Sequence, residues 1–181
     1  MALWHSYGPF TVFDLETTGM SPVRDRIVEI GAVRVEKDGT LSRFSTLVNP
    51  SIPIPPAVSR IHGIDDEMVK EAPLFKEAGY AFQDFARGSR LVAHNARFDL
   101  SFLQESFARV GLPLWKEGAY DSIILIRKAY PGLSSYSLPS LVRTWALEDD
   151  SIPGQAHRAG YDAEMTMLAF GMAMEKLIRE A

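Results

Sequence analysis

The chain has 181 residues and no cysteine, and 46% of its residues are hydrophobic and 23% charged. This arithmetic predicts one domain spanning residues 1–181 with a core at about 9–178, and it excludes collagen-like, disordered and disulfide-stabilised proteins, thiolate zinc sites and cysteine nucleophiles. The net charge of −4 excludes a large basic surface for duplex DNA, but it does not exclude a metal enzyme that acts on nucleic acid.

Three short strands are predicted near the beginning of the chain. Residues 10–16 form an apolar strand that ends at the turn-like sequence TTG. Residues 27–35 are rich in β-branched side chains, residues 37–40 (KDGT) have the composition of a hairpin turn, and residues 41–48 form the return strand. Strands joined this closely are expected to pair as an antiparallel meander.

The second half of the chain is predicted to be mainly helical. The expected elements are helices at 73–87, 96–110, 122–129, 137–145 and 158–178, a buried strand at 91–93 and a loop at 148–154. Asn95 is expected to cap the second of these helices through its side chain. A meander followed by helices that alternate with short strands predicts an α/β fold, with a mixed sheet covered by helices.

Asp14 and Glu16 are acidic residues within an apolar strand. Side chains two residues apart in a strand point to the same face, so these carboxylates share a side, with Cα atoms about 6.5–7 Å apart. Two like charges at the end of a buried strand need a partner, and a divalent cation is the simplest one. The D-x-E pattern is common and recurs at residues 65–67 and 162–164, but only the first copy lies in an apolar strand.

Three further residues could complete such a site. Asp99 either is stabilised by the dipole of its own helix or faces the first pair from the end of a neighbouring strand. His157 and Asp162 are five residues apart, about 140° around a helix, so they cannot share a helical face. If the last helix begins near residue 158, His157 precedes it and could act as a base beside a metal ligand; the alternative is a surface histidine near an acid at a helix start.

The segments FDLETTG, HNARFD and HRAGYDAE, in this order, resemble the three motifs of the DEDDh family of 3′–5′ exonucleases, typified by the proofreading epsilon subunit of bacterial replicative DNA polymerase. The segments RIVEIGAVRV, IHGIDDEMV and YSLPSLVRTW are also similar to that family, and the resemblance covers about residues 9–172. Asp65 departs from it, because the family often carries Thr there. Arg158 stands where the sister subfamily has a tyrosine, which favours the histidine subtype.

The resemblance implies an RNase H-like fold, in which a five-stranded mixed sheet (an antiparallel three-strand meander plus two parallel strands) is flanked by helices. It implies a centre of two divalent ions, Mg²⁺ or Mn²⁺, with Asp14 shared between them; the ligands would be Asp14, Glu16, Asp99 and Asp162, and the general base His157. It also implies that the terminal nucleotide is bound by Thr17, Thr18, Gly19, His62, Ile64 and Phe98.

The function expected from the resemblance is hydrolysis of the terminal phosphodiester of single-stranded or frayed DNA, with release of nucleoside 5′-monophosphates, as in polymerase proofreading. The expected partners are a nucleic acid 3′ end and a DNA polymerase or helicase subunit. An RNA-directed enzyme of the oligoribonuclease or RNase T type is the alternative, because the sequence does not decide between ribose and deoxyribose. A non-catalytic nucleic-acid-binding module should lack one of the acids or the histidine, and a glycosidase would leave three of them without a role.

Other locations and chemistries find no support in the sequence. No apolar run approaches the roughly 18 residues that span a bilayer, and the first residues, MALWH, lack the features of a signal peptide, so a cytoplasmic protein without a membrane partner is expected. The chain contains no G-x-G-x-x-G, P-loop, H-E-x-x-H or G-x-S-x-G motif. Nucleotide-cofactor, zinc-protease and α/β-hydrolase functions are therefore not indicated.

Overall fold

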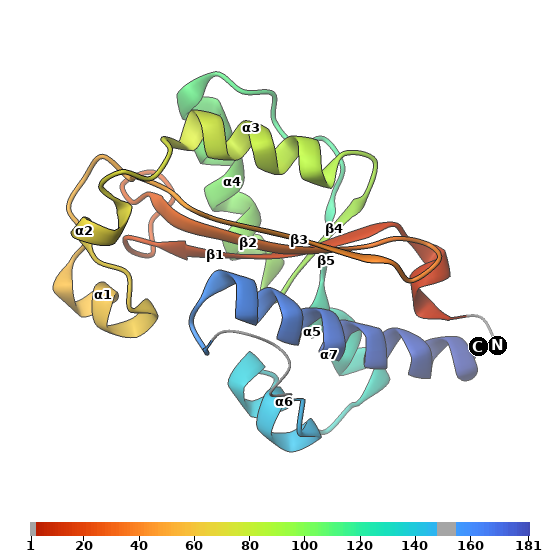
Figure 1. The fold of residues 1–181 in the computed structure, drawn as a ribbon. Helices are drawn as coiled ribbons and strands as arrows, with labels where there is room; N and C mark the ends of the chain where they lie inside the picture. Colours follow the sequence, from red (N-terminus) through yellow and green to blue (C-terminus); the bar gives the residue numbers. More distant parts are fainter. Residues whose placement is uncertain (1–2, 148–154) are drawn as a thin grey trace.

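The computed structural model describes residues 3–147 and 155–181, and a five-stranded sheet lies at its centre (Figure 1). The strands are β1 (Phe10–Thr17), β2 (Ile27–Val35), β3 (Leu41–Leu47), β4 (Arg90–Ala93) and β5 (Ala119–Asp121). Their order across the sheet is β3-β2-β1-β4-β5. The pairs β1–β2 and β2–β3 are antiparallel, whereas β1–β4 and β4–β5 are parallel. The predicted α/β fold, a meander extended by two parallel strands, is confirmed.

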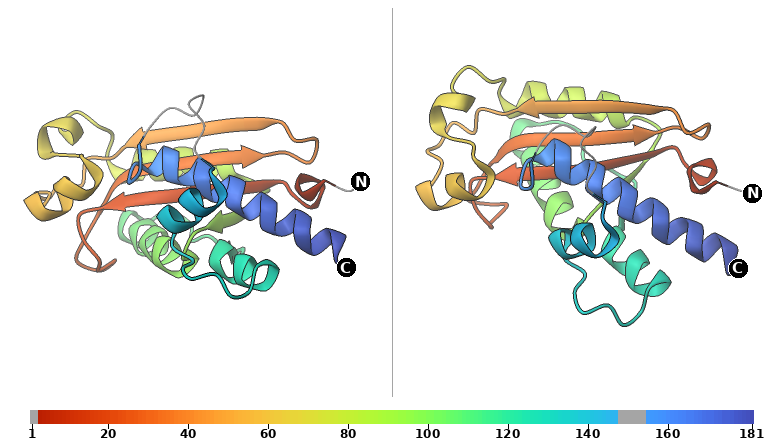
Figure 2. Two further views of the ribbon diagram at one scale, coloured as in Figure 1. Left: turned by 90° about the horizontal axis from the view of Figure 1, so that it is seen from below. Right: turned by 60° about the horizontal axis from the view of Figure 1, so that its bottom comes forward.

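Helices cover both faces of the sheet (Figures 1 and 2). They are the 3-10 helix η1 (Trp4–Tyr7) and the α-helices α1 (Pro56–His62), α2 (Asp66–Val69), α3 (Phe75–Ala86), α4 (Ala96–Val110), α5 (Ser122–Ala129), α6 (Leu138–Trp145) and α7 (Ala159–Arg179). α3 and α4 lie on one face, and α7 crosses the other along β1 and β2 with α5 and α6 packed against it. α1 and α2 lie beyond the end of the sheet at which β1 ends.

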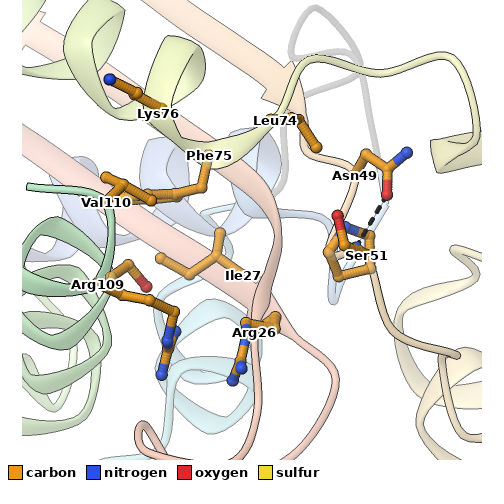
Figure 3. Close-up of a pocket in the computed structure, with 11 residues that line it drawn as sticks. Arg26, Ile27, Asn49, Ser51, Leu74, Phe75, Lys76, Arg109 and Val110 are labelled. Carbon is orange, nitrogen blue, oxygen red and sulfur yellow. Dashed lines mark hydrogen bonds between the residues drawn. The ribbon is translucent and has the colours of Figure 1, made fainter.

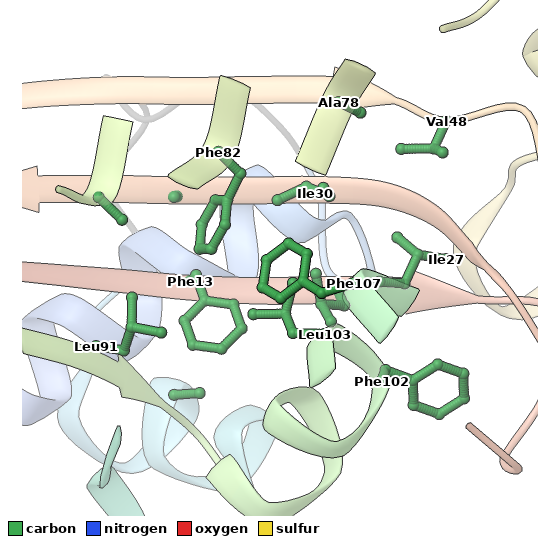
Figure 4. Packing of buried hydrophobic residues seen from close by; sticks show 14 of the residues in the cluster. Phe13, Ile27, Ile30, Val48, Ala78, Phe82, Leu91, Phe102, Leu103 and Phe107 are labelled. Atoms are coloured by element: carbon green, nitrogen blue, oxygen red, sulfur yellow. The ribbon is translucent and has the colours of Figure 1, made fainter. Parts of the chain in front are cut away.

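The alternation of side chains along β1 divides the core into two layers. Phe13 points toward α3 and α4, where it packs in an aromatic cluster with Phe82 and Phe107 (Figure 4). Phe10 points to the opposite face and packs against Phe170 of α7. Burial of each such side chain stabilises the fold by about 1.5–3 kcal/mol. The even-numbered residues of β1 therefore face α7.

The structure differs from the sequence-based expectations at several element ends. α3 begins at Phe75 rather than at residue 73, and α1 was not predicted because it is too short to show a helical period. The predicted side-chain cap of α4 by Asn95 is wrong: Asn95 adopts a left-handed conformation, and its side chain makes no capping hydrogen bond to the start of α4. Asp121 of β5 accepts a hydrogen bond from the Ala96 backbone N–H instead, at 3.2 Å.

The loop predicted at 148–154 lies outside the described residues. Among the residues that are described, no helix combines the length and apolar character needed to cross a membrane.

Candidate active site

Two carboxylates of β1 meet a carboxylate of α7 near the end of the strand. Asp14 and Glu16 are even-numbered residues of β1 and so point toward α7, whose first turn carries Asp162. One carboxylate oxygen from each of these residues lies within 4.8 Å of the other two, and all three residues are half-buried. The next residue, Ala163, packs in the apolar layer beneath β1 and so holds the helix start against the strand.

Asp99 joins this cluster from α4. It lies in the first turn of that helix and is only 3% exposed. Its charge is among those that raise the pKa of Asp14, and a hydrogen bond with the Leu15 backbone offsets part of the rise that burial causes in the pKa of Asp99. β4 pairs with β1 only as far as Val12, so α4 can approach the backbone of β1 beyond that point. The structure thus brings together all four acids that the sequence singled out.

Burial raises the pKa of all four carboxyl groups, and the charges of neighbouring carboxylates raise it further. Burial raises the pKa of Asp14 well above its ordinary value, and the charges of Asp99 and Asp162 raise it further. Burial raises the pKa of Glu16 to about 9, with contributions from Asp162 and Glu29. Burial also raises the pKa of Asp99 to about 8 and that of Asp162 to about 6. A cluster that retains protons in this way offers only carboxylate oxygens as metal ligands. It therefore fits hard divalent cations, which would displace those protons on binding.

His157 lies in the segment that precedes α7, as predicted. The residue is exposed and has a left-handed backbone conformation, with φ of 62°. Its backbone N–H donates a hydrogen bond to Asp162 Oδ2 at 3.2 Å, and its charge lowers the pKa of Asp162 against the larger effect of burial. The imidazole is therefore both open to solvent and within electrostatic reach of the acids, as a group that exchanges protons with water must be.

The turn that follows β1 is held in a fixed shape by hydrogen bonds. Thr17 Oγ1 donates to the Gly19 carbonyl at 2.6 Å, and Thr18 Oγ1 accepts from the Arg26 backbone N–H at 3.0 Å. A Cβ atom at Gly19 would lie 2.5 Å from a carboxylate oxygen of Asp25, so the position admits no side chain without rearrangement. This turn continues directly from the strand that carries Asp14 and Glu16.

The other predicted nucleotide contacts differ in how accessible they are. His62 ends α1, is 2% exposed, and accepts a hydrogen bond from the Ile64 backbone N–H through Nδ1 at 3.0 Å. Its pKa is lowered by burial and is also affected by the charges of Glu29 and His157, so it lies near the acid cluster. The side chain of Ile64 is completely buried and has no surface to offer a nucleotide. Phe98, which precedes Asp99, is half-buried.

Glu29 of β2 is the residue near the site that the sequence reasoning missed. It is 3% exposed, pairs in register with Glu16, and accepts hydrogen bonds from the Arg158 guanidinium. The signal was present in the sequence, because Glu29 is an acid between Val28 and Ile30 in an apolar strand. The same reasoning that singled out Asp14 could have found it.

A separate cavity of about 240 Å³ lies between the start of β2 and the facing ends of α3 and α4 (Figure 3). Its lining includes Ile27, Phe75 and Val110, with Arg26 and Arg109 at its edge. Arg109 donates to the carbonyl oxygens of residues 22 and 23 and so braces the segment that follows the Thr17–Gly19 turn. None of the four clustered acids lines this cavity.

The fold and the acid cluster correspond to a known class of enzymes. A family model described as exonuclease matches residues 11–170, and the chain belongs to this exonuclease family. The resemblance predicted from the three motifs is thereby confirmed, and so is the enzyme class, a 3′–5′ exonuclease that depends on divalent metal.

Two relatives and one solved structure are similar to this chain over most of its length. DNA polymerase III PolC-type from Caldanaerobacter subterraneus subsp. tengcongensis is 41% identical over 170 residues, which cover 94% of this chain but only 12% of that protein. DNA polymerase III subunit epsilon from Treponema pallidum is 39% identical over 168 residues, covering 92% of this chain and 76% of the relative. The structure of exonuclease X in complex with 5′ overhanging duplex DNA is 32% identical, with a TM-score of 0.72 and coverage of 92% and 91%.

Proposed function

We propose that this chain removes nucleotides one at a time from the 3′ end of single-stranded or frayed DNA. The observation that carries the proposal is the convergence of Asp14, Glu16 and Asp162 within 4.8 Å, with Asp99 beside them. DNA is favoured over RNA because the relatives described above are DNA polymerase III proteins and the similar structure is an exonuclease bound to DNA. The products would be nucleoside 5′-monophosphates.

The residues present fit a centre of two divalent ions, Mg²⁺ or Mn²⁺. The ligands would be Asp14, Glu16, Asp99 and Asp162, with Asp14 shared. Two such ions, when bound, lower the pKa of water and stabilise negative charge on the attacking and leaving oxygens. His157 would accept the proton of the attacking water. The water oxygen bonds to phosphorus, the bond from phosphorus to the O3′ of the preceding nucleotide breaks, and that oxygen takes up a proton to become the new 3′-hydroxyl.

The terminal nucleotide would be enclosed by two segments that approach the acids from different elements. The turn Thr17–Gly19 would contact the sugar, and the segment from His62 to Ile64 would contact the nucleotide through Gly63, which is exposed between two buried residues. Phe98 would lie beside the base. Such an enclosure leaves no room for a strand that continues past the 3′-hydroxyl, which favours an exonuclease over an endonuclease.

We place the activity in proofreading beside a DNA polymerase in the cytoplasm. This chain corresponds to 12% of the PolC-type relative and to 76% of the epsilon relative, so we treat it as one exonuclease domain and a polymerase as its partner. The polymerase would supply the frayed primer end as substrate.

A 5′-labelled single-stranded DNA oligomer tests this function. With Mg²⁺ or Mn²⁺, the chain should give a descending ladder and mononucleotides, EDTA should stop digestion, and a 3′-phosphate should slow the first cut. A matched RNA oligomer should be digested more slowly, and the opposite order would make RNA the substrate. Cleavage of a covalently closed single-stranded circle at a comparable rate would show an endonuclease and refute the proposal.

A further inference from the structure

A buried ion pair between Glu29 and Arg158 lies next to the acid cluster. The sequence analysis assigned neither residue a role in metal binding or catalysis. Glu29 of β2 has a side chain that is 4% exposed, and it faces Arg158, the residue before α7, whose side chain is 30% exposed. Arg158 Nη2 donates to Glu29 Oε1 at 2.6 Å, and Arg158 Nε lies 3.1 Å from Glu29 Oε2. The contact is bidentate, the strongest and most directional form of this pair. It joins residues 129 apart in the chain.

The same guanidinium also faces one of the predicted metal ligands. Glu16 and Glu29 are paired in register on β1 and β2. The charge of Arg158 lowers the pKa of Glu16 against the larger effect of burial. The hydrogen bond with Glu29 raises the pKa of Arg158, and the charges of Glu29 and Glu16 raise it further. Arg158 therefore has two carboxylates within electrostatic reach and forms its ion pair with Glu29.

Glu29 also holds the start of α7. Its Oε2 accepts a hydrogen bond from the Ala159 backbone N–H at 2.9 Å. Gly31, two residues along β2, allows the close approach: a Cβ atom there would lie 2.2 Å from the Ala159 carbonyl carbon. His157 and Asp162 lie on either side of this anchored point and are joined by a hydrogen bond.

We propose that Glu29 is a positioning residue for the metal centre. It holds Arg158 away from Glu16, so that Glu16 stays available to a divalent ion, and it fixes the helix start that carries Asp162. Without Glu29, the Arg158 guanidinium would be left within electrostatic reach of Glu16, and an ion pair there would compete with metal binding. The inference rests on the proposed function, because it assigns the cation to that same site.

Mn²⁺ binding to the full chain without nucleic acid, measured by calorimetry or electron paramagnetic resonance, tests the proposal. Glu29→Gln should weaken Mn²⁺ binding by about tenfold or more, as loss of such outer partners does in other metal sites. Glu29→Gln combined with Arg158→Gln should recover most of that loss, because the competing cation is gone. Glu164→Gln is the matched control: Glu164 is a buried acid of α7 that pairs with Arg43 of β3, and its loss should leave Mn²⁺ affinity nearly unchanged.

Two results would overturn the inference. One is wild-type Mn²⁺ affinity in a folded Glu29→Gln variant, and the other is a double variant that binds as weakly as the single one. If Glu29→Gln does not fold, Arg158→Gln decides the question, because it should bind Mn²⁺ at least as tightly as wild type, and weaker binding would contradict the proposal. A wild-type chain that binds Mn²⁺ but does not digest DNA would refute the proposed function and leave this inference standing.

Discussion

Asp14 is the residue on which the proposed chemistry depends most, because the neighbouring charges that raise its pKa all belong to carboxylates. We expect Asp14→Asn to abolish nuclease activity and leave the metal-free fold as stable or slightly more stable, since it removes one charge from a repulsive cluster. Mn²⁺ at about 100 times its dissociation constant should stabilise wild type by about 2.7 kcal/mol. Thermal melts with and without Mn²⁺ measure both effects. An equally large Mn²⁺ shift in the variant would remove Asp14 as a principal ligand.

The raised pKa values predict how the stability of the metal-free protein depends on pH. The folded chain has pKa values of about 9 at Glu16, about 8 at Asp99 and about 6 at Asp162, against ordinary values of 4.5 and 3.8. The folded state holds protons that the unfolded chain releases, so their stabilising contribution is complete below about pH 4 and is lost as pH rises toward 9. In EDTA, the melting temperature should therefore fall between about pH 5 and 9, and less steeply in Asp14→Asn. A flat or rising profile in wild type would contradict the description of the cluster.

His157 should matter for turnover and not for metal binding. If it accepts the proton of the attacking water, His157→Ala should lower turnover by about 10²–10⁴-fold while Mn²⁺ affinity stays near wild type. Single-turnover rates of both proteins at saturating Mn²⁺ provide the measurement. A variant within a few-fold of wild type would assign the base to another group.

At the scale of elements, the approach of α7 to β2 sets the geometry of the site. A Cβ atom at Gly31 would lie 2.2 Å from backbone atoms of α7, so Gly31→Ala must push the helix start away and should destabilise the fold by about 1–3 kcal/mol. It should also weaken Mn²⁺ binding, because Asp162 moves with the helix.

Gly160→Ala provides the matched control for that change. Among the described residues, a Cβ atom at Gly160 meets nothing closer than Ser45 Oγ at 3.9 Å, and alanine is the better helix former by about 1 kcal/mol. Chemical denaturation should therefore find this variant at least as stable as wild type. If Gly31→Ala is as stable as wild type, the start of α7 can move away from β2 without a loss of folding free energy, which would contradict this prediction.

The elements that the sequence predicted well are those with a clear period or clear ends. α4 runs over residues 96–110 as expected, because Gly111 ends it in a left-handed conformation, and α5 also matches its expected range. The start of α4 was less predictable, since its backbone is capped by Asp121, which lies 25 residues further along the chain. Caps supplied by another element leave no local pattern in the sequence.

At the scale of the whole molecule, the net charge of −4 disfavours binding along the length of a DNA duplex. It favours a substrate that is bound only at the end of a strand. Single strands should therefore be digested several-fold faster than blunt paired ends of the same sequence, and a mismatched 3′ end should fall between them. Initial rates on the three substrates test this expectation. Equal rates on single strands and matched duplex would indicate a duplex-binding surface that the net charge does not suggest.

The four acids could be predicted from the sequence for two reasons. Asp14 and Glu16 are charged residues in an apolar strand, and the three motifs that contain the acids occur in the same order as in the exonuclease family. The structure brings these acids together from β1, α4 and α7. The ion pair of Glu29 with Arg158 could not be predicted in this way, because strand pairing and helix packing alone bring the two residues together. His62 differs from this pair: the family resemblance singled it out, although the short helix α1 that carries it has no periodic pattern.

Crystals of the chain grown with Mn²⁺ and a short single-stranded oligonucleotide provide the most direct test of the central claim. Anomalous diffraction should reveal two Mn²⁺ ions that share Asp14, with the 3′-terminal phosphodiester beside them and the other ligands drawn from Glu16, Asp99 and Asp162. Anomalous peaks elsewhere on the molecule with none at the end of β1, or an oligonucleotide that passes the acids without ending there, would contradict the account.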